Sequence, residues 1–157
     1  QMKLIEQEKN YFIKDMVTGL YNNRHFQYEL EIEEEKNRRY PNKTETAVLL
    51  IKLNNFYEIV EKYGYEIGEQ VIKKIAQVVL KQSRKIDMPA RNDKNKFGLI
   101  LRTTNLKGSE VMIRRLELHL NNSVEVNKEK IPIQLEFKKT MMQPKEKKED
   151  MMKRLKK

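Results

Sequence analysis

The stretch Ala47-Val48-Leu49-Leu50-Ile51-Lys52-Leu53 decides the fold class of this chain. It opens with five consecutive apolar residues. Such a run predicts a short strand that is buried on both faces, because a half-exposed strand would alternate apolar and polar residues. Asn54 and Asn55 end the strand. A doubly buried strand needs helices on both sides of its sheet, so the stretch predicts an α/β fold.

The segments around this strand alternate between helical and strand patterns. We predict helices over residues 1–15, 22–39, 56–63, 67–82, 110–121 and 144–157, strands over 86–91 and 97–101 joined by a polar turn at 92–96, and a loop at 105–108. Alternating apolar residues from Val124 to Phe137 predict a hairpin that turns at Asn127-Lys128-Glu129. Since two of the joins are tight hairpins, we expect a mixed central sheet flanked by helices.

Composition excludes several functional classes. The chain has 157 residues, which suits one domain, and its lack of Cys excludes disulfides and cysteine nucleophiles. Only His25 and His119 are histidines, so a multi-histidine metal site is excluded. The sequence shows neither an apolar run of 18 residues nor a signal-peptide pattern. We therefore expect a cytoplasmic domain, and since residue 1 is Gln, a piece of a longer protein that a membrane anchor elsewhere could hold.

The positive charge is concentrated near the C-terminus. The formal net charge is +10, and residues 138–157 hold nine Lys/Arg against three Asp/Glu. This distribution does not favour a nucleic-acid-binding body. We expect the last helix to be solvated, with an anionic membrane surface or a protein partner as the alternatives.

The first 14 residues carry a helical stripe made of Met2, Ile5, Phe12 and, just beyond, Met16. The stripe is too short to be stable as an isolated helix in water. It predicts either a coiled-coil linker that joins two copies of the chain or a helix that packs on its own domain. The sequence leaves both interpretations open.

Three segments resemble the GGDEF domain family. Asp15-Met16-Val17-Thr18-Gly19-Leu20-Tyr21-Asn22-Asn23-Arg24-His25-Phe26 resembles the opening signature D-x-L-T-G-L-x-N-R-R-x-F, and residues 50–69 resemble the stretch D-x-D-x-F-K-x-x-N-D-x-x-G-H-x-x-G-D. Arg91-Asn92-Asp93-Lys94-Asn95-Lys96-Phe97 occupies the place of R-x-G-G-D-E-F. The resemblance implies a nucleotidyl cyclase-like fold over residues 15–157 and a role in signalling by cyclic di-GMP, which such domains make from two GTP molecules.

The same resemblance implies that the active site is degenerate. Lys52 and Asn54 stand where the family has metal-binding acids, and Val60 and Glu69 stand where it reads guanine. The signature turn reads Asp93, Lys94, Asn95 and Lys96 in place of Gly-Gly-Asp-Glu. A lysine that replaces a carboxylate 4 Å from a cation changes attraction into repulsion of about 4 kcal/mol per unit charge pair at an effective dielectric of 20. We therefore expect no bound metal, no cofactor and no cyclase activity.

One ligand site of the family is retained in the sequence. Arg84-Lys85-Ile86-Asp87 stands where many members carry an Arg-x-x-Asp motif that binds cyclic di-GMP as an inhibitor. An Arg fork suits the O6/N7 edge of guanine, and an Asp accepts from its N1–H and N2–H₂ groups. Arg114 or Arg115 could supply a second guanidinium, as in resembling domains.

The sequence leaves three functions open. The first is a catalytically inactive receptor for cyclic di-GMP, and the second is an interaction or dimerisation module that serves a signalling partner and binds no nucleotide. The third, a GTP-binding pseudoenzyme, is disfavoured by Val60 and Glu69.

Overall fold

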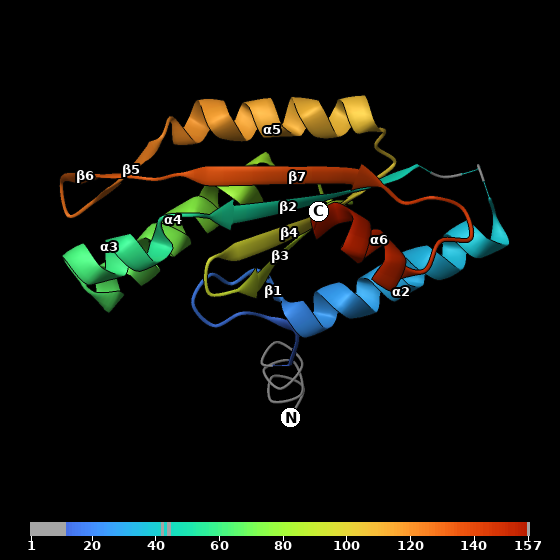
Figure 1. The fold of residues 1–157 in the computed structure, drawn as a ribbon, viewed down its shortest axis with the longest axis horizontal. Helices are drawn as coiled ribbons and strands as arrows, with labels where there is room; N and C mark the ends of the chain where they lie inside the picture. The colour runs from blue at the N-terminus through green and yellow to red at the C-terminus, as the bar shows by residue number, and fades with distance from the viewer. Residues whose placement is uncertain (1–11, 42, 44, 157) are drawn as a thin grey trace.

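A five-stranded mixed sheet forms the centre of the computed structural model, which describes residues 12–41, 43 and 45–156 (Figure 1). The strands lie in the order β1 (Tyr21–Asn22), β3 (Met88–Asp93), β4 (Lys96–Arg102), β2 (Thr46–Leu53) and β7 (Leu135–Met141). β1 is parallel to β3, whereas every other neighbouring pair is antiparallel. The predicted fold class is confirmed.

The central strand β2 is buried on both faces, as its composition predicts. Leu49 and Ile51 belong to a core beneath α3 (Phe56–Tyr63), α4 (Tyr65–Gln82) and α5 (Leu106–Leu120). Val48 belongs to a second core on the opposite face, beneath α2 (Asn23–Arg39) and α6 (Lys148–Lys156). Figure 1 shows α5 on one side of the sheet and α2 with α6 on the other.

Side-chain caps explain where two of the helices begin. The Asn22 side chain accepts a hydrogen bond from the backbone N–H of His25 and caps α2. Asn105 accepts one from Gly108 in the same way, so residues 105–108 form the first turn of α5 and not the predicted loop. β1 was not predicted, because two residues are too few to show a strand period.

The hairpin predicted from Val124 to Phe137 is only partly correct. β5 (Ser123–Val126) pairs with β6 (Glu129–Pro132) in a separate two-stranded sheet, and the turn lies where predicted. Beyond Pro132 the chain leaves this sheet. The buried Asn55 binds both the carbonyl of Pro132 and the N–H of Gln134, and the following residues join β2 as β7. Lys138 and Lys139 therefore lie in the central sheet and not in a tail.

The last helix is shorter and more buried than the sequence predicts. α6 begins at Lys148, and its Met151 and Leu155 are buried in the second core. The expectation of a solvated helix is therefore wrong for this face of α6.

The N-terminal stripe lies mostly outside the described residues. Of its members, Phe12 and Met16 are described, and both are exposed. The choice between a coiled coil and a helix packed on its own domain therefore stays open. Among the described residues, no helix is long and apolar enough to cross a membrane.

Candidate functional site

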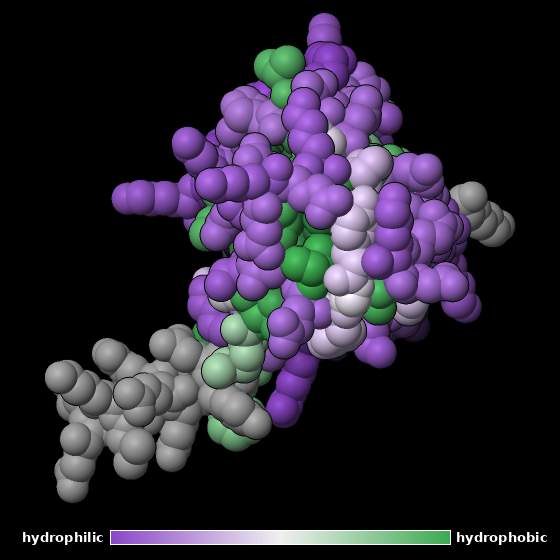
Figure 2. Space-filling model, turned by 90° about the vertical axis from the view of Figure 1, so that its left-hand side faces the viewer, coloured by the Kyte–Doolittle hydropathy of each residue, from purple (hydrophilic) through white to green (hydrophobic). Residues whose placement is uncertain are grey.

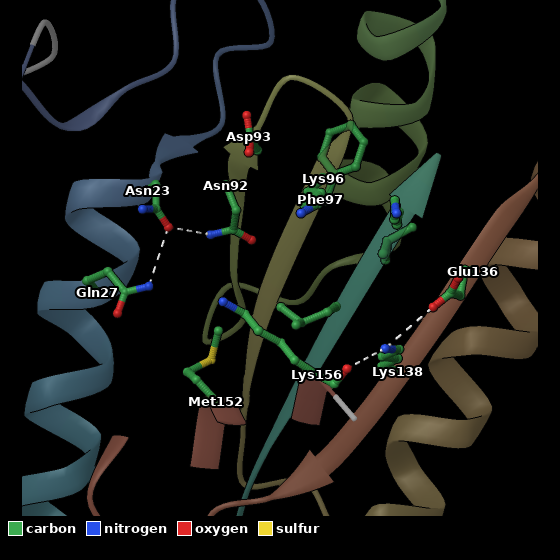
Figure 3. A pocket seen from close by; sticks show the side chains of 13 residues that line it. Asn23, Gln27, Asn92, Asp93, Lys96, Phe97, Glu136, Lys138, Met152 and Lys156 are labelled. Carbon is green, nitrogen blue, oxygen red and sulfur yellow. Dashed lines mark hydrogen bonds and ion pairs between the residues drawn. The ribbon is translucent and has the colours of Figure 1, made fainter. Parts of the chain in front are cut away.

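A pocket of about 500 Å³ opens where the second core ends, between α2, the sheet and α6 (Figure 3). Asn23 and Gln27 of α2 line one side, and Glu136 and Lys138 of β7 line the other. The remaining lining residues come from β2, the β3–β4 hairpin and α6: Leu50, Ile51, Lys52, Asn92, Asp93, Lys96, Phe97, Met152 and Lys156. Three of the degenerate positions, Lys52, Asp93 and Lys96, thus lie in one pocket.

Lys52 and Lys96 lie directly opposite each other on β2 and β4. Two ammonium groups in such a cross-strand pair repel each other and repel any nearby cation. Within the described part of the chain, no group of three or more His, Cys, Asp or Glu residues is arranged to hold a metal ion. The residues present therefore do not fit the divalent cations that the family's chemistry uses.

Asn54 points its amide at the opposite strand. Its Nδ2 donates to Glu136 Oε1 at 3.1 Å, and this hydrogen bond holds the pKa of the Glu136 carboxyl below its usual range. The positive charges of Lys138 and Lys52 lower the same pKa further. Glu136 therefore remains an anion among lysines, and Asn54 acts as a donor where the family has an acid.

The hairpin turn is built differently from a glycine turn. Asn95 is buried, and its Nδ2 donates to the carbonyl of Leu53 at 3.0 Å, while the backbone N–H of Leu53 donates to the carbonyl of Asn95. Asp93 Oδ1 accepts from the N–H of Lys94. None of the four turn residues adopts a positive φ. Asn95 thus ties the hairpin to β2, and its side chain faces inward, away from the pocket.

The two guanine-reading positions are also occupied otherwise. The Val60 side chain packs against Gly68: a Cβ added to Gly68 would lie only 2.7 Å from Val60 Cγ2. Glu69 accepts from Arg91 Nη2 at 3.0 Å, and Arg91 also binds Asp15 and the carbonyl of Lys94. The Arg91 side chain is only 8% exposed. A methyl group and a neutralised carboxylate leave nothing to pair with a guanine edge.

Arg84 and Asp87 form an ion pair at the opposite end of β4. Arg84 Nη2 lies 3.0 Å from Asp87 Oδ1, and Arg84 Nη2 also donates to the carbonyl of Arg102 and to Thr104. The Asp87 side chain is 2% exposed, and its Oδ2 accepts from the backbone N–H of Arg84. The Arg84 side chain is 48% exposed, so a ligand can reach it from solvent.

Arg115 shares a pocket with this pair, whereas Arg114 does not. The pocket has a volume of about 360 Å³. Besides Arg84, Asp87 and Arg115 it is lined by Glu45, Leu101, Thr103, Thr104, Asn105, Gly108, Val111 and Met112. Arg115 donates weakly to the carbonyl of Gln82. The structure therefore brings three of the four predicted ligand residues together and leaves Arg114 on the exposed surface.

Sequence reasoning missed the side chains that come from distant segments. Glu136, Lys138 and Lys156 complete the first pocket, and Thr104 completes the second. Neither β7 nor α6 is adjacent in sequence to the degenerate motif, so no local pattern pointed to them. The basic character of residues 138–157 was the one available signal.

Comparisons with known proteins agree with this fold. The family model described as "Diguanylate cyclase, GGDEF domain" matches residues 12–157, so the chain belongs to the GGDEF domain family. Among curated proteins, the response regulator PleD of Caulobacter vibrioides is 27% identical over 111 residues, which are 71% of this chain and 24% of that protein. The probable diguanylate cyclase DgcT of Escherichia coli K12 is 24% identical over 108 residues, which are 69% of this chain and 23% of that protein. The chain thus spans about a quarter of the length of these relatives.

Solved structures show the same fold. The coiled coil and GGDEF domain of DgcB from Caulobacter crescentus, in complex with c-di-GMP, superposes with a TM-score of 0.90 at 17% identity, covering 99% of this chain and 82% of that one. The diguanylate cyclase SiaD of Pseudomonas aeruginosa, in complex with its activator SiaC, gives a TM-score of 0.86 at 22% identity, covering 99% of this chain and 59% of that one. At these identities the likeness establishes the fold alone.

Proposed function

We propose that this chain is a GGDEF domain that makes no cyclic di-GMP and instead binds it at Arg84 and Asp87. The observation that carries the proposal is the pocket in which Arg84, Asp87 and Arg115 converge. Two guanidinium groups and a carboxylate supply the donors and acceptor that a guanine edge requires. The related DgcB domain was crystallised in complex with c-di-GMP, which makes this ligand the first to test.

The absence of catalysis is proposed from charge. A divalent cation beside Lys52 and Lys96 meets repulsion where the reaction needs carboxylates. Incubation of the purified chain with GTP and Mg²⁺ or Mn²⁺ is therefore expected to yield no cyclic di-GMP. Restoring carboxylates at positions 52, 95 and 96 is not expected to recover activity, since Val60 still packs on Gly68 and Arg91 still holds Glu69. Product above background from the unmodified chain would contradict the proposal.

Binding at the second pocket requires a local exchange of hydrogen bonds. Arg84 now donates to Thr104 and to the carbonyl of Arg102, and a guanine edge would replace these acceptors. Asp87 needs to turn partly outward, because its side chain is almost fully buried. We expect this exchange to lower the affinity relative to a preformed site.

Calorimetric titration with cyclic di-GMP tests the receptor function. We expect Arg84→Ala to weaken binding about 5- to 150-fold, since a bidentate contact to a guanine edge contributes about 1–3 kcal/mol. Asp87→Asn places an amide donor against the donors of guanine and is expected to weaken binding as well. Lys85→Ala is the matched control, because the exposed Lys85 lies beside Arg84 and does not line the pocket. Equal binding by wild type and Arg84→Ala would remove the receptor function.

The alternative is an interaction module that binds no nucleotide. The mutual saturation of Arg84 and Asp87 favours it, since the pair already satisfies both side chains without a ligand. The SiaD structure, which contains an activator protein, gives a precedent for a protein partner on this fold. A wild-type chain that shows no heat with cyclic di-GMP at tens of micromolar would leave this alternative as the function.

A further inference from the structure

The pocket beside Lys52 and Lys96 carries more positive than negative groups. Its lining includes the lysines at positions 52, 96, 138 and 156 and the carboxylates of Asp93 and Glu136. The Glu136 carboxylate already accepts a hydrogen bond from Asn54, and its Oε2 lies 3.6 Å from Lys138 Nζ. The pocket therefore presents a net positive surface at the place where the family holds cations.

Lys52 faces Lys96 of β4 on one side and Glu136 of β7 on the other, so the Glu136 carboxylate offsets part of the positive charge of this lysine pair. In the segments that the structure describes, the side chains of Lys52 and Lys96 form neither a salt bridge nor a hydrogen bond. The two residues nevertheless lie opposite each other across neighbouring strands, where like charges destabilise a sheet. An anion placed between the two ammonium groups would relieve this repulsion.

The neighbouring helix adds to the positive potential. Asn23, which lines the pocket, is the first residue of the 17-residue helix α2, and the first turn of α2 contains no acidic residue. The start of a helix carries a partial positive charge that favours anions. Figure 3 shows Asn23 and Asn92 at one side of the pocket and Lys156 extending into it from α6.

The pocket also has the size and floor of a small-molecule site. A volume of about 500 Å³ lies in the usual range for such sites. Leu50 and Met152 supply apolar surface below the charged groups. Figure 2 shows the left-hand end of the molecule of Figure 1, where hydrophilic side chains cover most of the surface and hydrophobic residues are visible between them.

We propose that this pocket binds the phosphate chain of a small polyanionic ligand directly, without a divalent cation. Lys52 and Lys96 supply the positive charge that metal ions supply in the family. We expect no specific contact to the base of a bound nucleotide, because Val60 and the Arg91–Glu69 ion pair occupy the positions that bind guanine in the family. This proposal does not depend on cyclic di-GMP binding, because the proposed cyclic di-GMP site lies at the other end of β4.

A cation-free site reverses the usual effect of magnesium. Mg²⁺ bound to a triphosphate removes much of its negative charge and adds repulsion against the lysines. Divalent cations are therefore expected to weaken binding, whereas they are required in a carboxylate site. Added salt is also expected to weaken binding, because the lysines are solvent-exposed or half-exposed.

Calorimetry of the full chain with inorganic tripolyphosphate, ATP and GTP, in EDTA and then in excess Mg²⁺, tests the proposal. We expect all three to bind in EDTA, with ATP and GTP within about threefold of each other, and all three to bind more weakly in Mg²⁺. Binding of the nucleotides without binding of tripolyphosphate would overturn recognition through the phosphate chain. Binding that requires Mg²⁺, or no binding at all, would overturn the proposal. Titration of the same sample with cyclic di-GMP reports separately on the receptor function.

Variants locate the binding in this pocket. Lys52→Ala and Lys96→Ala are each expected to weaken tripolyphosphate binding about 2- to 5-fold, the range for partly exposed ion pairs. Lys52→Glu combined with Lys96→Glu is expected to abolish it. Lys73→Ala is the matched control, since Lys73 is an exposed lysine of α4 that does not line the pocket. Removing one of two opposed lysines relieves repulsion, and the attraction between the exposed Lys52 and Glu136 contributes little to stability, so the alanine variants are expected to keep the wild-type melting temperature. A melting curve of each variant then separates a lost binding signal from unfolding. An unchanged affinity in Lys52→Ala and Lys96→Ala would overturn the assignment.

Discussion

Gly98 is the residue at which the second core tolerates no side chain. A Cβ at this position in β4 would meet Phe26 Cζ at 2.8 Å and Asn92 Oδ1 at 2.3 Å. Phe26 is fully buried and anchors α2 to the sheet. The glycine thus lets α2 approach β4 closely, and this approach sets the width of the pocket that Asn23 and Asn92 line.

Gly98→Ala is expected to destabilise the fold by about 1–3 kcal/mol, the usual cost of overpacking a core. Thermal or urea unfolding measures the loss. Phe26→Leu makes room beside residue 98, so the double variant is expected to be less destabilised than the sum of the two single changes. Additive losses would show that the contact with Phe26 is not the cause.

Single residues also mark the limit of what the sequence predicted about the sites. Lys52 and Lys96 were identified from their place in a motif, and the structure confirms that they share a pocket. The sequence did not distinguish Arg114 from Arg115. Neighbouring residues on a helix point about 100° apart, so only the packing of α5 decides that Arg115 faces Arg84.

At the scale of elements, an ion-pair cluster holds α2 on the sheet. Glu33 is buried on the inner face of α2 and accepts from Arg102 Nε at 3.0 Å and from the hydroxyl of Thr46. Arg102 also binds Glu29 one turn earlier at 2.8 Å. The cluster joins α2 to β2 and β4 at the end remote from the lysine pocket. It therefore fixes the direction in which the helix points its first residue.

Arg102→Met is expected to destabilise the chain by about 1–3 kcal/mol, because it leaves the buried Glu33 with only the exposed Lys36 as a cationic partner. The expected loss is smaller than for a fully buried pair, since Arg102 is a quarter exposed. Chemical denaturation measures the change. Glu35→Gln is the control on the same helix. Glu35 binds Arg38 and Arg39 at the exposed surface, so its replacement is expected to leave the unfolding midpoint unchanged. Equal losses in both variants would contradict a special role for the buried cluster.

Local patterns predicted elements well where one periodicity held throughout. The apolar run of β2 and the helical stripe of α4 both folded as expected. The alternation from Val124 to Phe137 misled because it continues unbroken through Pro132 and Gln134, where the chain passes from one sheet to the other. That transition is set by the side chain of Asn55, a residue about 80 positions away. Only tertiary structure could reveal it.

At the scale of the whole molecule, β4 connects two chemically different pockets. Lys96, its first residue, lines the lysine pocket, and Leu101, near its end, lines the pocket of Arg84 and Asp87. The strand itself is buried and paired on both edges. Ligands bound at the two ends, as proposed, would therefore contact one rigid element without contacting each other.

Association of two copies through the N-terminal stripe remains a prediction. Met16 is 77% exposed and Phe12 is 58% exposed, so these two members of the stripe offer apolar surface that a second copy would cover. We expect the full chain to show a weak, concentration-dependent rise in light-scattering mass toward a dimer, because so short a stripe is only marginally stable as a helix.

Deletion of residues 1–14 is expected to abolish that rise, and Met16→Lys is expected to reduce it without removing any backbone. Lys73→Ala serves as the control, since it changes an exposed residue of α4 far along the chain from the stripe. A full chain that stays monomeric at every concentration would favour the helix packed on its own domain. In that case the deletion is expected to lower the melting temperature instead, because the domain would lose packed apolar surface.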